Sequence, residues 1–276
     1  TVRKELPGLY QFSDWLPINR ILQGSASPVT YHSQGLGKHL GLPRLYITFN
    51  GYCPEKGARM MTGTFKECEA FSVCARFPKE SGKVLVVASA GNTARAFMKV
   101  ASENEIPLVV VVPEKNMGSL WHIDALKPCV KIIAAGGDSD YTDAIRLSDL
   151  ICGIEGFYPE GGAKNVARRD GMGTTVLSAV TTIGEIPDYY FQAVGSGTGA
   201  IAAHESNLRF NQSGKYGQKI MSLQCSQNEP FVPIYNSWKS GSSTIPEMDE
   251  DEARQKVDAI NAKVLSNRKP PYSLVG

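Results

Sequence analysis

The feature that most constrains the fold of this chain is a glycine-rich turn between an apolar run and a helix-forming run. Residues 189–194 are apolar and β-prone, the turn reads Gly195-Ser196-Gly197-Thr198-Gly199, and residues 200–205 favour a helix. This order predicts a strand, a tight turn and a helix whose first N–H groups are free. Such a turn suits a phosphate, because glycines let the backbone approach an anion and the Ser196 and Thr198 hydroxyls add donors.

Three kinds of phosphate loop compete for this turn. A Walker loop ends in Gly-Lys-Ser/Thr, which the chain lacks. A dinucleotide loop needs Gly-x-Gly-x-x-Gly and an acid after the next strand, but the next apolar run, Ile220–Leu223, is followed by Gln224 and Cys225. A monophosphate cup remains, and for an isolated motif an ordinary strand-to-helix turn is the stronger alternative.

Composition limits the class of protein. The 276 residues are 42% hydrophobic and 20% charged, enough for two lobes or one large α/β domain. The net charge of +2 includes no dense basic block, so we expect small-molecule partners and no nucleic acid. Apolar runs such as 108–112 are too short to cross a bilayer, so no membrane contact is expected.

The cysteines and histidines show no metal-site or disulfide spacing. Six scattered cysteines without a Cys-x-x-Cys pair favour reduced thiols and a cytoplasmic location, and no metal is expected. The chain begins at Thr1 without a methionine and stops at Gly276, so we expect it to be part of something longer.

From Lys83 onward, apolar strands alternate with helices. The strand at 84–87 is apolar throughout, as in a parallel sheet buried on both faces. The pattern predicts strands at 44–49, 84–87, 107–112, 130–134, 157–158 and 219–224, and helices at 31–40, 64–77, 94–104, 117–126, 140–152, 173–184 and 249–266, with a loop at 50–63. Two α/β lobes joined by two crossings are the simplest arrangement.

Lys66 is the sharpest candidate for chemistry. It follows Gly63-Thr64-Phe65 at the start of a predicted helix, in an apolar neighbourhood. Burial and the positive end of the helix would lower the pKa of its ammonium and make the amine a nucleophile. For a lysine considered alone, a solvated position in the first turn is the favoured alternative.

A second turn, Ser89-Ala90-Gly91-Asn92-Thr93, joins the strand at 84–87 to a helix. Its N–H groups and the Ser89 and Thr93 hydroxyls can bind a carboxylate, and the Asn92 amide can meet a phenolic oxygen. A helix N-cap by Asn92 or Thr93 would explain the motif equally well. Taken with Lys66 and the phosphate cup, however, the turn describes one ligand: pyridoxal 5'-phosphate, which has an aldehyde, a ring hydroxyl and a phosphate.

Four motifs carry a family resemblance: Ser27-Pro28-Val29-Thr30, Gly63-Thr64-Phe65-Lys66, Ser89-Ala90-Gly91-Asn92-Thr93 and Gly195-Ser196-Gly197-Thr198-Gly199. In this order they resemble the threonine-synthase-like branch of the fold-type II pyridoxal-phosphate enzymes, which are tryptophan synthase β-like. Within the branch the chain looks most like the cysteate synthases, on stretches at 6–8, 14–17, 49–52, 162–174 and 190–199.

The resemblance implies two three-layer αβα lobes with mostly parallel sheets and a homo-oligomer. Residues 1–75 and 164–276 would form the large cofactor-binding lobe, whose C-terminal part lies beyond Gly276. Residues 76–163 would form the small lobe that binds the substrate carboxylate.

The resemblance also implies a reaction: O-phospho-L-serine and sulfite give L-cysteate and phosphate, on a route to coenzyme M in methanogenic archaea. Lys66 would bind the cofactor aldehyde and remove the α-proton, Asn92 would bond the ring hydroxyl, and Gly195, Ser196, Gly197, Thr198 and Gly199 would hold the phosphate. Ser89, Gly91, Asn92 and Thr93 would bind the substrate. Because the leaving phosphate and sulfite are anions, Lys164, Arg168 and Arg169 are candidates for a further cationic site, with a solvated basic face as the alternative.

The chain departs from the family pattern at a few places. Glu67-Cys68 replaces the frequent Asp-Arg, and Ala94 replaces a frequent glycine. The family's amino-terminal Cys-x-x-Cys element and its partner for the pyridine nitrogen are expected outside these 276 residues. Two alternatives therefore stay open: a threonine synthase acting on O-phosphohomoserine, and a catalytically silent regulatory relative.

Overall fold

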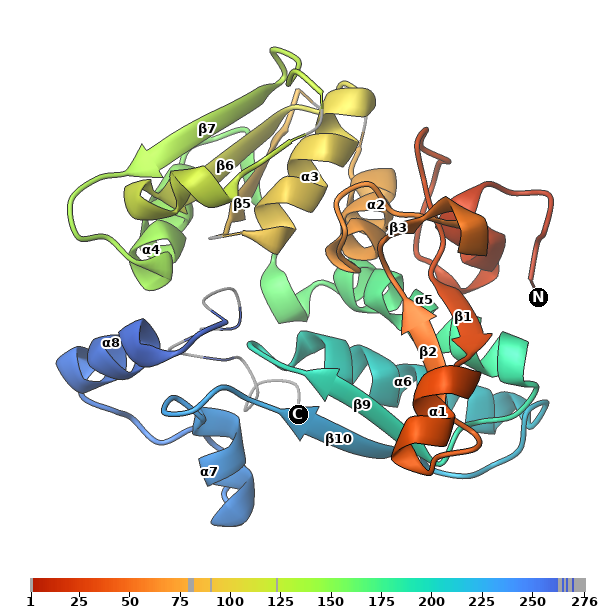
Figure 1. Cartoon of the computed structure of the whole chain (residues 1–276). Coiled ribbons are helices and arrows are strands. Elements are labelled where there is room, and N and C mark those ends of the chain that lie inside the picture. The colour runs from red at the N-terminus through yellow and green to blue at the C-terminus, as the bar shows by residue number, and fades with distance from the viewer. Residues whose placement is uncertain are drawn as a thin grey trace.

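The computed structural model describes residues 2–78, 82–89, 91–122, 124–262, 265, 267 and 270. The largest sheet within these residues has four parallel strands in the order β7-β6-β5-β8 (Figure 1). They are β5 (Val84–Ala88), β6 (Leu108–Pro113), β7 (Val130–Ala135) and β8 (Phe157–Pro159). The sequence predicted all four strands to within one residue at each end, and the parallel α/β class is confirmed.

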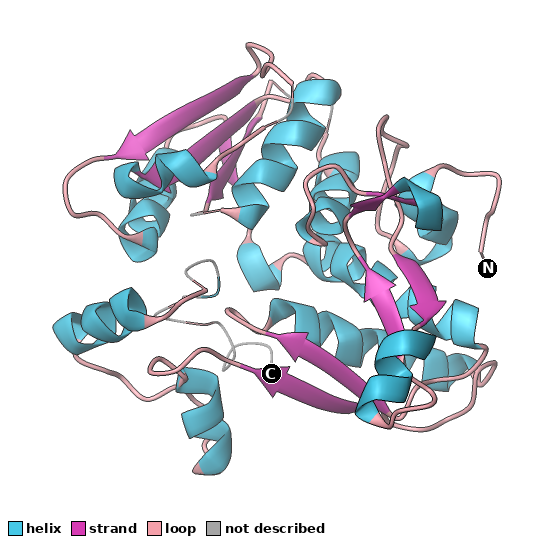
Figure 2. Ribbon diagram, in the orientation of Figure 1, coloured by secondary structure: helices cyan, strands magenta, loops and turns pink. Residues whose placement is uncertain are grey.

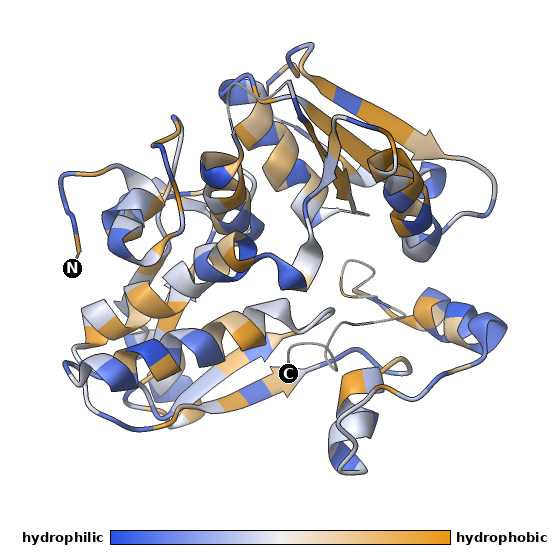
Figure 3. Ribbon diagram, turned by 180° about the vertical axis from the view of Figure 1, so that it is seen from behind, coloured by the Kyte–Doolittle hydropathy of each residue, from blue (hydrophilic) through white to orange (hydrophobic). Residues whose placement is uncertain are grey.

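Both faces of this sheet are covered, which is why its strands are apolar throughout. Side chains alternate across a strand, so Leu85 and Val87 pack on one face and Val86 on the other. Helix α3 (Asn92–Glu103) covers the first face and α4 (Tyr141–Cys152) the second (Figure 1). The orange, apolar strands between these helices stand out in Figure 3.

A second, separate sheet pairs β9 (Tyr189–Ala193) with β10 (Ser222–Ser226) in parallel. Helix α6 (Thr198–Ser213) follows β9 and packs on α5 (Val166–Ile183), and side chains such as Val180 and Phe210 fill the core beneath. Helix α2 (Lys66–Arg76) packs against both α3 and α5, so it connects the two sheets (Figure 2). The division of the chain at residues 76 and 163 into two lobes stays a prediction.

The amino-terminal part corrects one predicted helix. Residues 29–32 form strand β1 (Val29–His32), which pairs antiparallel with β2 (Tyr46–Phe49), and helix α1 spans only Gln34–Leu40. The prediction of a helix from Tyr31 was wrong because β-branched and aromatic residues gain more from strand pairing. Gly41 ends α1 at φ 69°, as expected. The predicted loop at 50–63 contains the short strands β3 (Tyr52–Cys53) and β4 (Ala58–Arg59).

Three other helices differ from expectation. In place of the predicted helix at 117–126, the structure has a short 3-10 helix at Glu114–Ser119, and Ile123 lies outside the described residues. Gly118 has no side chain and Trp121 is exposed, so the segment has no continuous apolar face that could pack as a helix. Helix α5 begins at Val166 rather than 173, because Asn165 caps it by accepting from the Ala167 N–H. Helix α8 covers Glu250–Ala259, and residues 263, 264 and 266 of the longer predicted helix lie outside the described residues.

The carboxyl-terminal part also holds a helix that the sequence analysis missed, α7 (Pro233–Lys239). Three 3-10 segments complete the element order: Gly8–Trp15, Pro54–Lys56 and Gly162–Lys164. No helix in the described part of the chain is long and apolar enough to span a membrane.

Candidate active site

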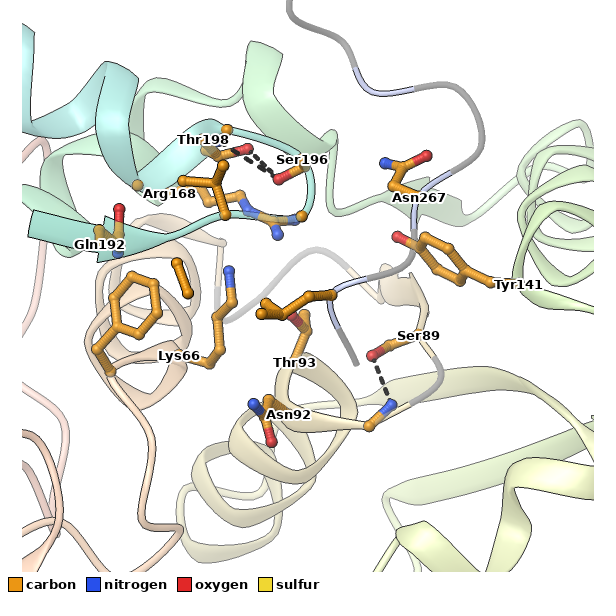
Figure 4. Close-up of a pocket in the computed structure, with 18 residues that line it drawn as sticks. Lys66, Ser89, Asn92, Thr93, Tyr141, Arg168, Gln192, Ser196, Thr198 and Asn267 are labelled. Atoms are coloured by element: carbon orange, nitrogen blue, oxygen red, sulfur yellow. Dashed lines mark hydrogen bonds between the residues drawn. The ribbon is translucent and has the colours of Figure 1, made fainter. Parts of the chain in front are cut away.

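A pocket next to the ends of β5 and β9 brings together the residues of all three chemical motifs (Figure 4). Its lining is Phe65, Lys66, Ser89, Gly91, Asn92, Thr93, Tyr141, Arg168, Gln192, Ala193, Val194, Gly195, Ser196, Gly197, Thr198, Gly199, Leu265 and Asn267. Within the described residues four helices begin here, since Lys66, Asn92, Tyr141 and Thr198 are the first residues of α2, α3, α4 and α6. Four positive helix ends facing one space favour an anionic ligand.

Lys66 lies inside this pocket and not in solvent. Its side chain is only 17% exposed, its Nζ is 3.3 Å from Glu69 Oε2, and it points toward the glycine loop (Figure 4). Burial lowers the pKa of the Lys66 ammonium, the nearby Glu69 carboxylate opposes this, and the positive charge of Arg168 adds to the lowering. The amine is therefore neutral, and nucleophilic, at a lower pH than an ordinary lysine.

The glycine loop has the form of an anion cup. Gly197 adopts φ 79°, which turns the chain into α6, and the Ser196 and Thr198 hydroxyl oxygens lie 2.8 Å apart. Among the described residues, the N–H groups of Gly197 and Gly199 have no hydrogen-bond acceptor. A Cβ on Gly199 would lie 2.6 Å from the Gln192 side-chain oxygen, so a side chain there would crowd the cup.

The turn after β5 is held by Ser89. Its Oγ accepts from the N–H groups of Gly91 at 3.2 Å and Ala94 at 3.1 Å, so Ser89, rather than Asn92 or Thr93, secures the start of α3. Ala90, part of the predicted motif, lies outside the described residues. Asn92 Oδ1 accepts from Arg95, a group that can only donate, and this orients the amide and leaves Nδ2 as the donor for a ligand.

Arg168 lines the pocket but is paired with two carboxylates. Its Nη1 lies 2.6 Å from Glu160 Oε2 and its Nε 3.2 Å from Glu69 Oε2, and all three side chains are at most 11% exposed. Burial disfavours the charged guanidinium, but Glu160 and Glu69 outweigh this and raise the pKa of Arg168. Arg168 therefore stays charged inside the site.

The other two predicted cations do not line this pocket. Arg169 Nε donates to both oxygens of Glu205, at 3.0 and 2.8 Å, and Lys164 is exposed beside a separate hollow near Arg76. Neighbouring positions on a helix point about 100° apart, so Arg168 and Arg169 cannot face the same space. The structure thus brings one of the three basic residues to the site.

Sequence reasoning missed Tyr141 and Gln192. Tyr141 follows Asp140, whose side chain accepts hydrogen bonds from the N–H groups of Thr142 and Asp143 in a capping box. Burial raises the pKa of the Tyr141 phenol. The sequence signal for Tyr141 was the capping-box spacing Asp140-x-x-Asp143, which predicts a helix start directly after β7. A residue at this helix start lies at the same edge of the sheet as Ser89. Gln192 is a polar residue in an otherwise apolar strand.

Comparison with known proteins agrees with this geometry. Residues 28–273 match the family model of pyridoxal-phosphate dependent enzymes. The chain belongs to this family. Its cofactor is pyridoxal 5'-phosphate, as predicted.

Curated relatives of this pyridoxal-phosphate enzyme are cysteate synthases. The protein of that name from Methanocella paludicola is 50% identical over 99% of this chain and 64% of its own length, and that from Methanocorpusculum labreanum is 47% identical over 100% and 67%. The chain thus spans about two thirds of the length of these relatives.

Solved structures show the same fold at low sequence identity. The diaminopropionate ammonia lyase of Escherichia coli matches with a TM-score of 0.61 at 14% identity, over 91% of this chain and 70% of that one. The L-serine ammonia-lyase of Rhizomucor miehei gives 0.60 at 16%, over 90% and 73%. These likenesses confirm the fold-type II class.

The residues present fit the cofactor. The buried Lys66 amine, the N–H groups of the glycine loop and the Asn92 Nδ2 match its aldehyde, phosphate and ring hydroxyl. Gln192 Oε1 is buried at the lining with no partner among the described residues, so the pocket also holds a spare acceptor. In the same part of the chain no group of three His, Cys, Asp or Glu side chains is placed to hold a metal ion.

Proposed function

We propose that this protein catalyses a β-replacement with pyridoxal phosphate, in which O-phospho-L-serine and sulfite give L-cysteate and phosphate. The observation that carries the proposal is that the Lys66 amine and the loop at 195–199 line one pocket. The name of the curated relatives, cysteate synthase, supports the product, and the family resemblance implies the two substrates.

The cofactor would be held by groups from both sheets. The N–H groups of Gly195 to Gly199 and the Ser196 and Thr198 hydroxyls bind its phosphate, Asn92 Nδ2 donates to its ring hydroxyl, and Lys66 bonds its aldehyde. When bound, pyridoxal phosphate acts as an electron sink that stabilises negative charge at the substrate α-carbon.

The start of α3 would bind the amino-acid end of the substrate. The N–H groups of Asn92 and Thr93 and the hydroxyls of Ser89 and Thr93 would surround the carboxylate, with Gly91 at the lining between them. Lys66, whose amine would hold the cofactor through its aldehyde, would also take the α-proton of the substrate. This step needs a neutral amine, and burial favours that form because it lowers the pKa of the Lys66 ammonium.

The chemistry at the β-carbon involves two anions in turn. The bond from the β-carbon to the phosphate oxygen would break, and phosphate would leave with its electron pair. The sulfite sulfur would then bond the same carbon with its lone pair, and the proton held by Lys66 would return to the α-carbon. Arg168 is the lining guanidinium, and Tyr141 lies close enough for the Arg168 charge to influence its phenol. We assign both to this end of the pocket and leave out Lys164 and Arg169, whose side chains lie elsewhere.

The test is to incubate full-length, cofactor-loaded protein with O-phospho-L-serine, with and without sulfite, and to identify the product by mass. We expect cysteate and phosphate only when sulfite is present. Phosphate release from O-phosphohomoserine without sulfite would identify a threonine synthase instead. No turnover of either substrate, with the cofactor bound, would identify a catalytically silent relative.

The assembly and location of the protein are part of the same proposal. By its resemblance to fold-type II enzymes we expect a cytoplasmic homo-oligomer that acts on small molecules. A monomeric mass in light scattering of full-length protein would contradict the oligomer.

A further inference from the structure

Four buried charges form a continuous chain at the back of the pocket. Lys66 contacts Glu69, Glu69 contacts Arg168, and Arg168 contacts Glu160, with N-to-O distances of 3.3, 3.2 and 2.6 Å. The two cations and two carboxylates balance each other. Of the four, Glu69 is the most buried, at 0% exposure.

Glu69 uses a single oxygen for both cations. Oε2 accepts a hydrogen bond from Lys66 Nζ and forms an ion pair with Arg168 Nε at 3.2 Å that is not a hydrogen bond. Oε1 has no hydrogen-bond partner among the described residues. A buried carboxylate is costly unless it is paired, and the two cations compensate the charge of Glu69. Conversely, the carboxylate holds the amine, because residues three apart on a helix lie on the same face.

Arg168 and its partner limit the movement of Glu69. Arg168 comes from α5 and Glu160 from the end of β8, so the position of Oε2 is defined by two elements besides α2. The phenol of Tyr141 from α4 and the thiols of Cys68 and Cys74 from α2 are further titratable groups close enough to interact with these charges. On the side of α2 that faces α3, Lys99 of α3 forms ion pairs with Glu67 of α2 and Glu103 of α3.

We propose that Glu69 is a positioning residue that holds the Lys66 amine in the pocket and determines the pH range in which this amine reacts. The proposal rests on the assigned role of Lys66 as the cofactor's lysine. A carboxylate at 3.3 Å stabilises the ammonium and opposes the effect of burial. Its removal must therefore lower the pKa of Lys66 further.

The test is labelling of Lys66 in cofactor-free protein by a short pulse of trinitrobenzenesulfonate over a pH series, read by peptide mass. In Glu69→Gln we expect the labelling midpoint of Lys66 to fall by about one pH unit. The matched control is Glu67→Gln, the same substitution at a buried carboxylate of α2 that accepts from Thr62 and pairs with Lys99. Its midpoint should equal that of the wild type.

A second variant covers the case in which Glu69→Gln does not fold. Glu69→Asp keeps the charge but withdraws it by about 1.5 Å, one carbon–carbon bond, so a smaller shift in the same direction is expected. The proposal is overturned if the folded Glu69 variants titrate like the wild type, or if Glu67→Gln shifts Lys66 equally. Because no substrate is involved, this result is independent of whether phosphoserine and sulfite are turned over.

Discussion

At the scale of single residues, we propose that the glycines of the loop at 195–199 serve both folding and binding, and the two contributions can be separated. Gly197 and Gly214 stand at opposite ends of α6, at φ 79° and 66°. An L-residue at either position is strained by the same left-handed backbone. Only Gly197 belongs to the pocket.

We therefore predict that Gly197→Ala and Gly214→Ala each lower the free energy of unfolding by about 1 kcal/mol. Gly197→Ala should in addition weaken pyridoxal-phosphate binding about tenfold, equivalent to roughly 1.4 kcal/mol. Absorbance titration and thermal unfolding measure the two effects. Equal cofactor affinities in the two variants would remove the loop from the binding site.

Tyr141 tests the assignment of the anion end of the pocket. Tyr141→Phe removes one hydroxyl from the lining and none from the glycine loop. We predict that cofactor affinity is unchanged and that kcat/KM for the phosphorylated substrate falls about tenfold, the value of one charge-assisted hydrogen bond. Tyr189→Phe, on an exposed side chain of β9, is the control and should behave as the wild type. An unchanged kcat/KM in Tyr141→Phe would place the anions elsewhere.

The sequence predicted the candidate site residues that belong to local backbone motifs, and the structure places these residues in one pocket. Lys66, the turn at 89–93 and the loop at 195–199 each belong to a short strand-turn-helix or helix-start motif, so their chemistry was visible from a few neighbours. The pairing of Arg168 with Glu69 joins positions 99 residues apart (168 − 69), and no local pattern reports such a contact. The distinction between Arg168 and Arg169 likewise needed the orientation of α5.

At the scale of elements, the site depends on how closely α2 and α5 pack. A Cβ on Gly171 of α5 would lie 2.5 Å from the Cys68 carbonyl oxygen and 3.0 Å from Glu69 Cα, both backbone atoms of α2. These atoms cannot move without shifting the helix that carries Lys66. The glycine therefore fixes the distance between the two helices.

A pair of substitutions on one helix tests this close approach. Gly171→Ala should lower the free energy of unfolding by about 1–3 kcal/mol, the usual cost of overpacking, and weaken cofactor binding. Gly173→Ala should cost less, because its nearest neighbour is the Ser206 hydroxyl, which can rotate away. Denaturant unfolding compares the two variants. A Gly173→Ala variant as unstable as Gly171→Ala would argue against the role of helix spacing.

Element boundaries were predictable where propensity and tertiary contacts agree. The strands β5 to β8 are apolar on both faces, and the same burial that makes them apolar makes them recognisable. Residues 31–32 were wrongly assigned to a helix because their structure depends on a partner strand at 46–49. Residues 117–122 were wrongly assigned to a helix because the segment lacks an apolar face. Propensity alone does not contain that information.

At the scale of the whole molecule, the pocket exists because two separate parallel sheets present their carboxyl ends to one space. Ser89 follows β5 of one sheet, and Gly195 follows β9 of the other. The alternation of strands and helices predicted two βα units of this kind, but not the order β7-β6-β5-β8 or the meeting of four helix starts. The strand order depends on pairings between segments up to 73 residues apart (157 − 84), such as Val84 with Phe157, and the meeting of helix starts joins positions as distant as Lys66 and Thr198.

The central claim is that Lys66 bonds the aldehyde of a cofactor whose phosphate lies in the loop at 195–199. The most direct measurement is to load the protein with pyridoxal phosphate, reduce the covalent link with borohydride, and locate the label by peptide mass. The account predicts a phosphopyridoxyl group on the peptide containing Lys66, and none in Lys66→Ala. A label on another lysine, or equal labelling of Lys66→Ala, would contradict it.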